Sequence, residues 1–369
     1  MRSNNHFSLI GHPKDIETMH NFIGAYRKNY HAKRMNDDLL YKLLEWTPSY
    51  KGFDITLQSM ENRQDAHGSL YFATFFPEML FNNREKVLNR IRQALSKSET
   101  EKASVAALGG FTSIADGQQG ELVSKVVNSM AVTNGTTFTS AMVVESLKKM
   151  CALVRLDLED AHLAIIGATG SIGRACAGYF TEKTRRLTLT GKKIEKLRAV
   201  FHDKFQEDNS SVAYTIDNKA AVKDADIVIC VTSTISSIFE AEDFKSGAIV
   251  CDVGFPKNIS NACAHRPDII AYSGGMAKIP GKIEHSKVYS MPSDEILYGC
   301  FSEAIIVAME GCFEYCTVGN ADIPAANIEA LAKIGFKHGF SVPEFFNDQK
   351  RYQNRDFETI EKAIKNNNN

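Results

Sequence analysis

Three regularly spaced glycines form the most informative pattern in the chain. Gly167, Gly170 and Gly173 follow the apolar run 163–166 and open a segment whose apolar residues recur at helical spacing. This pattern predicts a strand, a tight turn and a helix whose N-terminus faces a phosphate group. The spacing is Gly-x-x-Gly-x-x-Gly rather than Gly-x-Gly-x-x-Gly, and glycine turns also occur in ordinary α/β units. Dinucleotide binding and a purely structural turn are both open on this evidence alone.

A second signal follows the next expected strand, 186–190. NAD-binding units carry an acidic residue here to hold the ribose 2′-hydroxyl, whereas this chain has Lys192 and Lys193. Positive charge suits a 2′-phosphate, so the sequence favours NADPH; the alternative is that both lysines lie on an ordinary helix surface. The expected cofactor-binding residues are Gly167, Thr169, Gly170, Ser171, Ile172, Gly173, Lys192, Lys193, Thr232 and Ser233.

Cysteine is a residue type that could form a covalent intermediate in this chain. The eight cysteines include no CxxC pair, which argues against a disulfide framework. Cys312 and Cys316 would share a helical face, but no second pair completes a four-ligand set, so we expect no metal. A cysteine thiolate attacks thioesters and holds the acyl group for a later hydride transfer. Spacing alone allows any of the eight; Cys300 is favoured because it follows a glycine near an expected helix start.

The way in which the Cys300 thiol would be activated is left open by the sequence. Residues 292–295 have the composition of a helix start, which predicts a helix over 296–315. If the helix begins at Ser293, within that start segment, Cys300 lies nearly two turns inside it, where the dipole effect has faded. His338 and Lys257 are candidates for charge or proton work, although both residue types are commonly structural. Glu303 and Glu310 are expected to cap helices or form ion pairs.

Alternating strands and helices predict an α/β fold with a Rossmann-like doubly wound parallel sheet at 160–290. The expected strands are 162–166, 186–190, 212–216, 226–231, 248–252 and 269–272. Residues 1–130 lack this rhythm, and we expect an N-terminal α+β domain there that binds the substrate. The remaining expected segments are a connecting helix at 131–159, C-terminal helices that carry the nucleophile at 291–345, and a mobile polar tail at 346–369.

Four segments of the N-terminal region have alternative interpretations. The aromatic run 69–80 is either core packing or an apolar wall for a substrate. The basic amphipathic helix expected at 82–95 is either a solvated face or a surface for an acidic carrier protein or lipid headgroups. The glycine-containing segments 106–114 and 132–139 predict tight turns or places where the backbone meets a ligand.

Composition and charge limit the partners. The chain has 369 residues, a formal net charge of -1 and 44% hydrophobic residues, and its basic clusters are short, so we expect no nucleic-acid binding. The N-terminus lacks the apolar segment of a signal peptide, and no later run of about 18 apolar residues could span a bilayer. We therefore expect a cytoplasmic protein with at most peripheral membrane contact.

Motifs along almost the whole chain resemble those of the long-chain acyl-(acyl-carrier-protein) reductases, which form fatty aldehydes. The matching segments are 7–12 (FSLIGH), 76–80 (FPEML), 107–114 (ALGGFTSI), 135–139 (GTTFT), 167–173 (GATGSIG), 252–258 (DVGFPKN), 299–304 (GCFSEA) and 337–340 (KHGF). In that family the cysteine of the 299–304 segment is the acylated nucleophile, which corresponds to Cys300 here. Two departures are Val253, where a glycine is usual, and Lys192, where the cyanobacterial reductases have arginine.

The resemblance implies an NADPH-dependent reduction in two steps. Acyl carrier protein or coenzyme A delivers a fatty thioester, Cys300 takes the acyl group, and hydride transfer releases a fatty aldehyde. An aldehyde-deformylating oxygenase is a candidate consumer of that aldehyde. Two alternatives stay open: a thioester reductase like glutamyl-tRNA reductase, which the lack of an extended basic surface disfavours, and a non-catalytic NADP-binding module.

Overall fold

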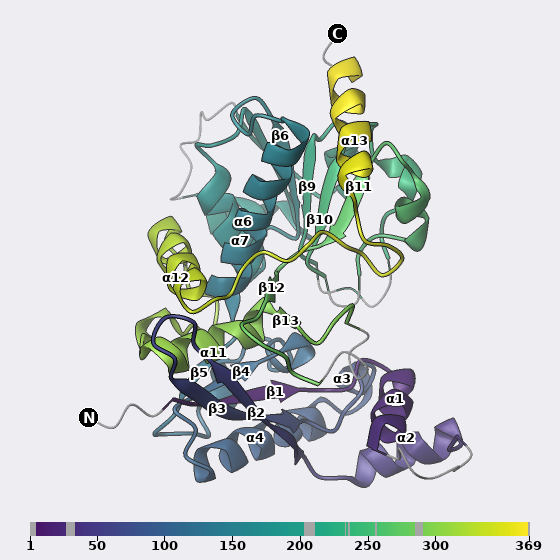
Figure 1. Ribbon diagram of the computed structural model, residues 1–369. Coiled ribbons are helices and arrows are strands. Elements are labelled where there is room, and N and C mark those ends of the chain that lie inside the picture. Colours follow the sequence, from purple (N-terminus) through teal and green to yellow (C-terminus); the bar gives the residue numbers. More distant parts are fainter. Residues whose placement is uncertain are drawn as a thin grey trace. The chain divides into compact units, whose positions relative to one another are not determined.

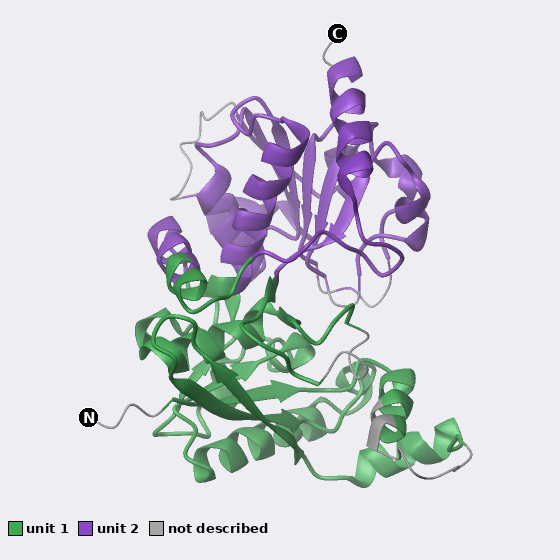
Figure 2. Ribbon diagram, in the orientation of Figure 1, with its two compact units in different colours: residues 1–138, 277–321, 333–341 green, residues 139–276, 322–332, 342–369 purple. Residues whose placement is uncertain are grey.

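The chain forms two units, each built around its own β-sheet, that are interleaved in sequence (Figure 2). Unit 1 comprises residues 1–138, 277–321 and 333–341, and unit 2 comprises residues 139–276, 322–332 and 342–369. The computed structural model describes residues 5–26, 34–202, 211–232, 234, 237–254, 257–284 and 291–367. No helix within these ranges is both long enough and apolar enough to cross a membrane.

Unit 2 contains the predicted doubly wound sheet. Its six parallel strands are β6 (His162–Ile166), β7 (Arg186–Thr190), β8 (Val212–Thr215), β9 (Ile227–Cys230), β10 (Ile249–Asp252) and β11 (Ile270–Ser273). They lie in the order β11-β10-β9-β6-β7-β8; Figure 1 labels β11, β10, β9 and β6. The direction of winding reverses between β6 and β9, and open α/β sheets bind their ligands at such a reversal. The predicted fold class is confirmed, and each strand lies within one residue of its predicted bounds.

Both faces of this sheet are covered, which explains why its strands are formed by almost uninterrupted apolar runs of sequence. Every residue of β6, β9 and β10 is buried, as near-continuous apolar sequence in a parallel sheet requires. The helices of this part of the chain are α6 (Thr136–Val154), α7 (Ser171–Phe180), α8 (Ile194–Phe201) and α9 (Asn218–Lys223). Helix α6 begins in unit 1 and continues into unit 2. Helix α12 (Ala325–Lys337) begins in unit 2 and ends in unit 1.

Unit 1 contains a second, largely parallel sheet, which the pattern of residues 1–130 did not predict. Its strands are β1 (His6–Gly11), β2 (Tyr50–Gln58), β3 (Asp65–Phe72), β4 (Val105–Leu108) and β5 (Ala131–Thr133), in the order β2-β3-β1-β4-β5. Only β2 is antiparallel to its neighbour within this sheet of the described chain. Helix α4 (Arg84–Thr100) covers one face and α11 (Gly299–Glu310) the other (Figure 1). The shorter helices are α1 (Ile16–Tyr26), α2 (Asp37–Trp46), α3 (Met79–Asn82) and α5 (Glu121–Ser124).

For two segments of unit 1, the aromatic run and the basic helix, the structure partly decides between the alternative interpretations. The aromatic run contributes to the core, since Phe75 and Phe76 are at most 2% exposed. The basic helix is α4, and its cations have partners within the chain: Lys86 pairs with Glu45 at 3.1 Å, and Arg90 donates to the Glu45 main-chain oxygen at 3.1 Å. These contacts attach α4 to α2.

Helix α11 begins later than the sequence suggested. Residues Ile296–Tyr298, expected inside a helix over 296–315, instead form strand β13, which pairs with β12 (Met276–Lys278). The helix therefore starts at Gly299, and it ends at Glu310, where Gly311 adopts a left-handed conformation. Because α11 packs on the sheet of unit 1, residues expected to form a separate C-terminal segment at 291–345 belong largely to the same unit as the N-terminal sheet.

The tail expected to be mobile contains a helix, α13 (Asn354–Asn367). Phe357, Ile360 and Ile364 recur at helical spacing and give it an apolar face. Ile360 is buried, and Ile364 lies where a Cβ on Gly247 would meet it at 3.1 Å. Polar residues of the tail outnumber these three apolar ones, and the helical periodicity is therefore hard to recognise in the sequence. The three apolar side chains pack the helix on the rest of unit 2.

Candidate active site

Cys300 is the second residue of helix α11. Tyr298 is the extended N-cap residue, so Cys300 lies in the first turn, where backbone N–H groups and the helix dipole favour a negative charge. This position corrects the expectation that Cys300 sits nearly two turns inside the helix. The reason is that Ile296–Tyr298 is a strand, and the dipole is therefore available to stabilise a thiolate.

Two glycine loops of unit 1 close around Cys300. A Cβ atom on Gly135 would lie 2.1 Å from Cys300 Cα, and Gly135 has a left-handed φ of +71°. A Cβ atom on Gly109 would lie 2.3 Å from the Phe301 ring. The loops follow β5 and β4, two adjacent parallel strands whose carboxyl ends share an edge. The structure thus brings the two glycine segments singled out in the sequence against two neighbouring residues, Cys300 and Phe301, in the first turn of α11.

Two opposing effects act on the pKa of the Cys300 thiol: burial, which disfavours the thiolate, and backbone N–H donors, which favour it. Burial raises the pKa of the Cys300 thiol to about 12, and backbone hydrogen bonds from Gly110, Phe301 and Cys300 itself act in the opposite direction. All eight cysteines are described, and Cys300 and Cys316 are the two that are not buried as whole residues. The free thiol is protonated at neutral pH, while the donors around it are placed to stabilise the charge that forms on reaction.

Glu303, one helical turn after Cys300, is a buried carboxyl group that anchors the loop of Gly135. It accepts a hydrogen bond from the Thr133 hydroxyl and another, 2.7 Å long, from the backbone N–H of Phe138. The second bond places a carboxylate at the N-terminus of α6, where negative charge is favoured. Burial nevertheless raises the pKa of Glu303 to about 7. The expected capping role is confirmed for Glu303.

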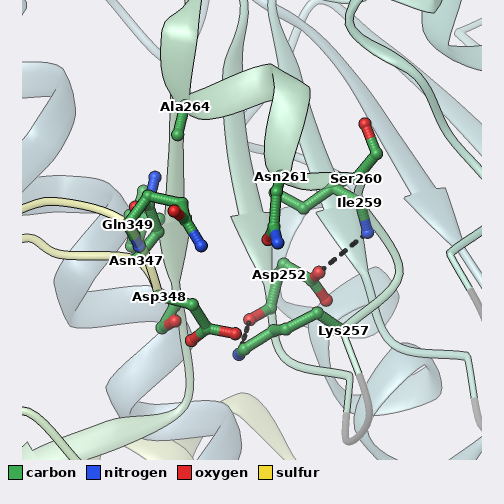
Figure 3. Close-up of a pocket in the computed structure, with 11 residues that line it drawn as sticks. Asp252, Lys257, Ile259, Ser260, Asn261, Ala264, Asn347, Asp348 and Gln349 are labelled. Carbon is green, nitrogen blue, oxygen red and sulfur yellow. Dashed lines mark hydrogen bonds between the residues drawn. The ribbon is translucent and has the colours of Figure 1, made fainter.

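His338 and Lys257, the sequence-based candidates for proton work, are engaged elsewhere. The His338 ring bonds to Ser59 Oγ at 2.7 Å through Nδ1 and to Glu310 Oε2 at 2.8 Å through Nε2. In unit 2, Lys257 Nζ donates to the main-chain oxygen of Asp252 at 3.0 Å, at the end of β10 (Figure 3). Both side chains hold loops in place, and we assign neither a role in proton transfer. Glu310 forms the ion pair expected for it with Lys337, at 3.1 Å.

The glycine turn of unit 2 has the form that accommodates a pyrophosphate. Gly167 has a φ of +90°, and a Cβ on Gly173 would lie 2.5 Å from the Gly167 oxygen, so both positions require glycine. A Cβ on Gly170 would meet nothing closer than 3.4 Å, which leaves its outer side open to a ligand. Helix α7 begins at Ser171, and its N-cap residue Gly170 has no side chain to cap it. A dinucleotide phosphate therefore fits this turn.

Two other predicted cofactor-binding residues, Thr169 and Thr232, lie close to this turn or to the end of β7. Thr169 lies near the end of β7, since a Cβ on Gly191 would meet its methyl group at 3.1 Å. Thr232, after β9, would be 2.9 Å from a Cβ on Gly167, and its hydroxyl donates to the Asn258 side chain. Ser171 and Ile172 occupy the first turn of α7, Lys192 and Lys193 are exposed, and Ser233 lies outside the described residues.

Comparison with known proteins agrees with this division of the chain. Residues 148–273, which include the sheet of unit 2, match the family model of shikimate / quinate 5-dehydrogenases. The chain is 26% identical over 352 residues to a long-chain acyl-[acyl-carrier-protein] reductase of Synechococcus elongatus, covering 90% of this chain and 98% of that protein. The resemblance indicated by the motifs is confirmed.

Similarity to glutamyl-tRNA reductases is more partial. The chain is 22% identical over 223 residues to the enzyme of Thermoplasma volcanium, covering 60% of this chain and 49% of that protein. The solved nucleotide-binding domain of glutamyl-tRNA reductase from that organism covers 36% of this chain and 84% of its own length, at 19% identity and a TM-score of 0.27. Together the relatives support an oxidoreductase with an NAD(P)-binding unit.

Proposed function

We propose that this protein reduces long-chain fatty acyl thioesters to fatty aldehydes through an acyl group held on Cys300. The observation that carries the proposal is the placement of Cys300 in the first turn of α11, against the loop of Gly135. Backbone hydrogen bonds from Gly110, Phe301 and Cys300 itself lower the pKa of its thiol, against the effect of burial. The long-chain acyl-[acyl-carrier-protein] reductase that aligns with 90% of the chain supports acyl carrier protein as the acyl donor. Acyl-CoA presents the same thioester and is the alternative donor.

The first half-reaction is a transfer between thiols. The Cys300 thiol loses its proton to solvent, and its sulfur forms a bond to the thioester carbonyl carbon. The bond between that carbon and the carrier sulfur then breaks, and the carrier leaves as a thiolate that takes up a proton. The backbone donors of Gly110, Cys300 and Phe301 stabilise negative charge next to the reacting carbon.

In the second half-reaction, negative charge develops again on the sulfur of Cys300. Bound NADPH would supply the hydride that converts the thioester carbonyl to an aldehyde. Cys300 then leaves as a thiolate, which the same donors stabilise until it is protonated. We propose that Gly167, Thr169, Gly170, Ser171, Ile172 and Gly173 hold the pyrophosphate, with Thr232 beside it. The positive charge of Lys192 and Lys193, with no acid at the end of β7, supports NADPH over NADH.

The fate of the product follows from its chemistry. A long-chain aldehyde is reactive and poorly soluble in water, so an aldehyde-consuming enzyme, such as an aldehyde-deformylating oxygenase, is the partner we propose. We place this reaction in the cytoplasm, where acyl carrier proteins and coenzyme A are substrates in fatty-acid metabolism.

A second candidate is reduction of glutamyl-tRNA, because the chain is 22% identical to a glutamyl-tRNA reductase over 60% of its length. That reaction also passes through a cysteine thioester. The two candidates are distinguished by offering each donor to the same enzyme preparation: turnover of a long-chain acyl thioester and none of glutamyl-tRNA supports our proposal, and the reverse contradicts it.

The proposed function is tested by steady-state aldehyde formation from a long-chain acyl-(acyl carrier protein) and NADPH. Cys300→Ala should form no aldehyde, because the acyl group then has no thiol to receive it. Cys316→Ala is the matched control, since Cys316 is the other cysteine that is not buried, and it should keep its activity. Aldehyde formation by Cys300→Ala at the wild-type rate would contradict the covalent route.

A further inference from the structure

His12 is a buried histidine beside the loop of Gly110 that the proposed reaction does not use. It directly follows β1 and is 3% exposed. Its ring stacks on Phe75, with 4.8 Å between the ring centroids, and meets the Phe111 ring edge-on at 5.7 Å. A histidine packed between two phenylalanines has a single orientation, so its two nitrogen atoms point at fixed partners.

The hydrogen bonds of His12 determine its tautomer. Nδ1 lies 2.8 Å from the Pro13 main-chain oxygen, and Nε2 lies 3.0 Å from the backbone nitrogen of Phe111. A carbonyl oxygen only accepts and a backbone N–H only donates, so the proton is on Nδ1 and Nε2 is the acceptor. Burial lowers the pKa of His12 to about 4, which keeps the ring neutral, and Nε2 an acceptor, at neutral pH.

The partner of Nε2 belongs to the loop that faces Cys300. Within this loop the Gly109 N–H donates to the Ile10 oxygen at 3.0 Å, and the Phe111 N–H donates to His12. The end of β1 therefore holds the loop on both sides of Gly110. Gly110 has a left-handed φ of +59°, and the neighbouring Gly109 packs against the Phe301 ring in the first turn of α11. A backbone hydrogen bond from Gly110 lowers the pKa of the Cys300 thiol, against the effect of burial.

We propose that His12 is a positioning residue for Cys300: Nε2 fixes the Phe111 N–H and thereby keeps the Gly110 N–H directed at the Cys300 sulfur. The proposal rests on the proposed function only in taking Cys300 as the nucleophile. Without the Nε2 acceptor, the Phe111 N–H would be buried and unsatisfied, and the loop would reorient to find it a partner. The Gly110 donor would then be lost from the sulfur.

The test compares variants that separate the acceptor from the ring. His12→Phe keeps the aromatic packing and removes the acceptor, whereas His12→Gln carries an amide oxygen to the place of Nε2 and restores it. His67→Phe is the matched control, because His67 is an exposed histidine of unit 1. The probe is iodoacetamide, with alkylation of the Cys300 peptide followed by mass spectrometry from about pH 7 to 9, without acyl donor.

We expect His12→Phe to be alkylated at Cys300 about tenfold more slowly than the wild type at each pH, which corresponds to a thiol pKa about one unit higher. His12→Gln and His67→Phe should remain within about threefold of the wild type, a difference of less than half a pKa unit. Wild-type rates in His12→Phe, or rates in His12→Gln as low as in His12→Phe, would overturn the proposal. Should His12→Phe not fold, His12→Asn, which has no acceptor at the place of Nε2, provides the same comparison with His12→Gln.

The outcome is independent of the proposed function. Alkylation needs neither acyl donor nor cofactor. A wild-type protein that accepts no acyl group would therefore refute the proposed function, while the alkylation rates of the His12 variants could still be compared. Acyl transfer to Cys300, measured on the same variants, should fall in His12→Phe and recover in His12→Gln. A structural role alone would lower thermal stability in His12→Phe without changing the ratio between Cys300 and Cys316 alkylation.

Discussion

Gly135→Ala should disable acyl transfer to Cys300 without unfolding the protein. The added Cβ would lie 2.1 Å from Cys300 Cα and 2.3 Å from Cys300 Cβ. Gly311→Ala is a matched control at the other end of α11, since Gly311 also has a left-handed φ, +77°, but a Cβ there would meet nothing within 4 Å. The pair separates backbone strain from contact with the nucleophile.

The size of the effect follows from these distances. Both variants place alanine in a left-handed conformation, which costs about 1–2 kcal/mol of stability. In Gly135→Ala the new atom is also about 1.4 Å closer to a backbone atom than an ordinary carbon–carbon contact of ~3.5 Å. Cys300 Cα cannot rotate away, so Cys300 and its donors must separate by roughly 1 Å. Misplacement on that scale lowers reaction rates by about 100-fold, or roughly 2.7 kcal/mol in the barrier.

The assay is single-turnover acylation followed by intact mass, with thermal unfolding measured on both variants. We expect Gly311→Ala to be acylated at close to the wild-type rate and Gly135→Ala about 100-fold more slowly. Equal acylation rates in two folded variants would refute the claim that the Gly135 loop is packed against the nucleophile.

Three further predictions follow from the electrostatics. Because burial raises the pKa of Cys300 to about 12, the thiolate fraction and the acylation rate should rise about tenfold per pH unit from pH 6 to 9; a plateau near neutral pH would contradict this. Burial raises the pKa of Glu303 from its ordinary value of 4.5 to about 7, so its contribution to stability is greatest below about pH 4.5 and is lost as pH rises to about 7. In denaturant unfolding, the free energy of unfolding of the wild type should therefore fall by about 3 kcal/mol across that window relative to Glu303→Gln. A difference between the two proteins that does not depend on pH would show that the pKa of Glu303 is not raised. Lys192→Glu should lower the preference for NADPH over NADH at least about tenfold in kcat/KM, whereas Lys196→Glu, an exposed position of α8, should not; equal effects would remove Lys192 from the 2′-phosphate site.

The sheet of unit 2 could be predicted from the sequence because its signals are local. Each strand is a short apolar run bounded by turn residues, and both sheet faces are covered by helices that occur between the strands in sequence. The turn of Gly167 is equally local, since its geometry depends on residues within one strand and one helix. Here the motif and the fold point to the same edge of the sheet.

The sheet of unit 1 could not be predicted in this way. Strands β4 and β5 have four and three residues, too few to show a period, and their neighbours come from distant parts of the chain. The start of α11 was misplaced for the same reason, because Ile296–Tyr298 is a strand only through its pairing with β12.

The supporting residues of the active site depend on contacts across long sequence separations. His12 bonds to Phe111, 99 positions away, and Glu303 bonds to Thr133, 170 positions away. A buried histidine and a buried glutamate carry no pattern that reveals such partners. Their signal in the sequence was only that both lie in segments shared with the acyl-(acyl-carrier-protein) reductases.

The central claim is that Cys300 carries the acyl group, and intact mass tests it most directly. The protein is incubated with a long-chain acyl-CoA or acyl-(acyl carrier protein) without NADPH, and the modified peptide is identified. We expect one acyl adduct, on Cys300, that disappears with release of aldehyde when NADPH is added. A folded protein that binds NADPH but forms no adduct, or forms it on another residue, would contradict the account.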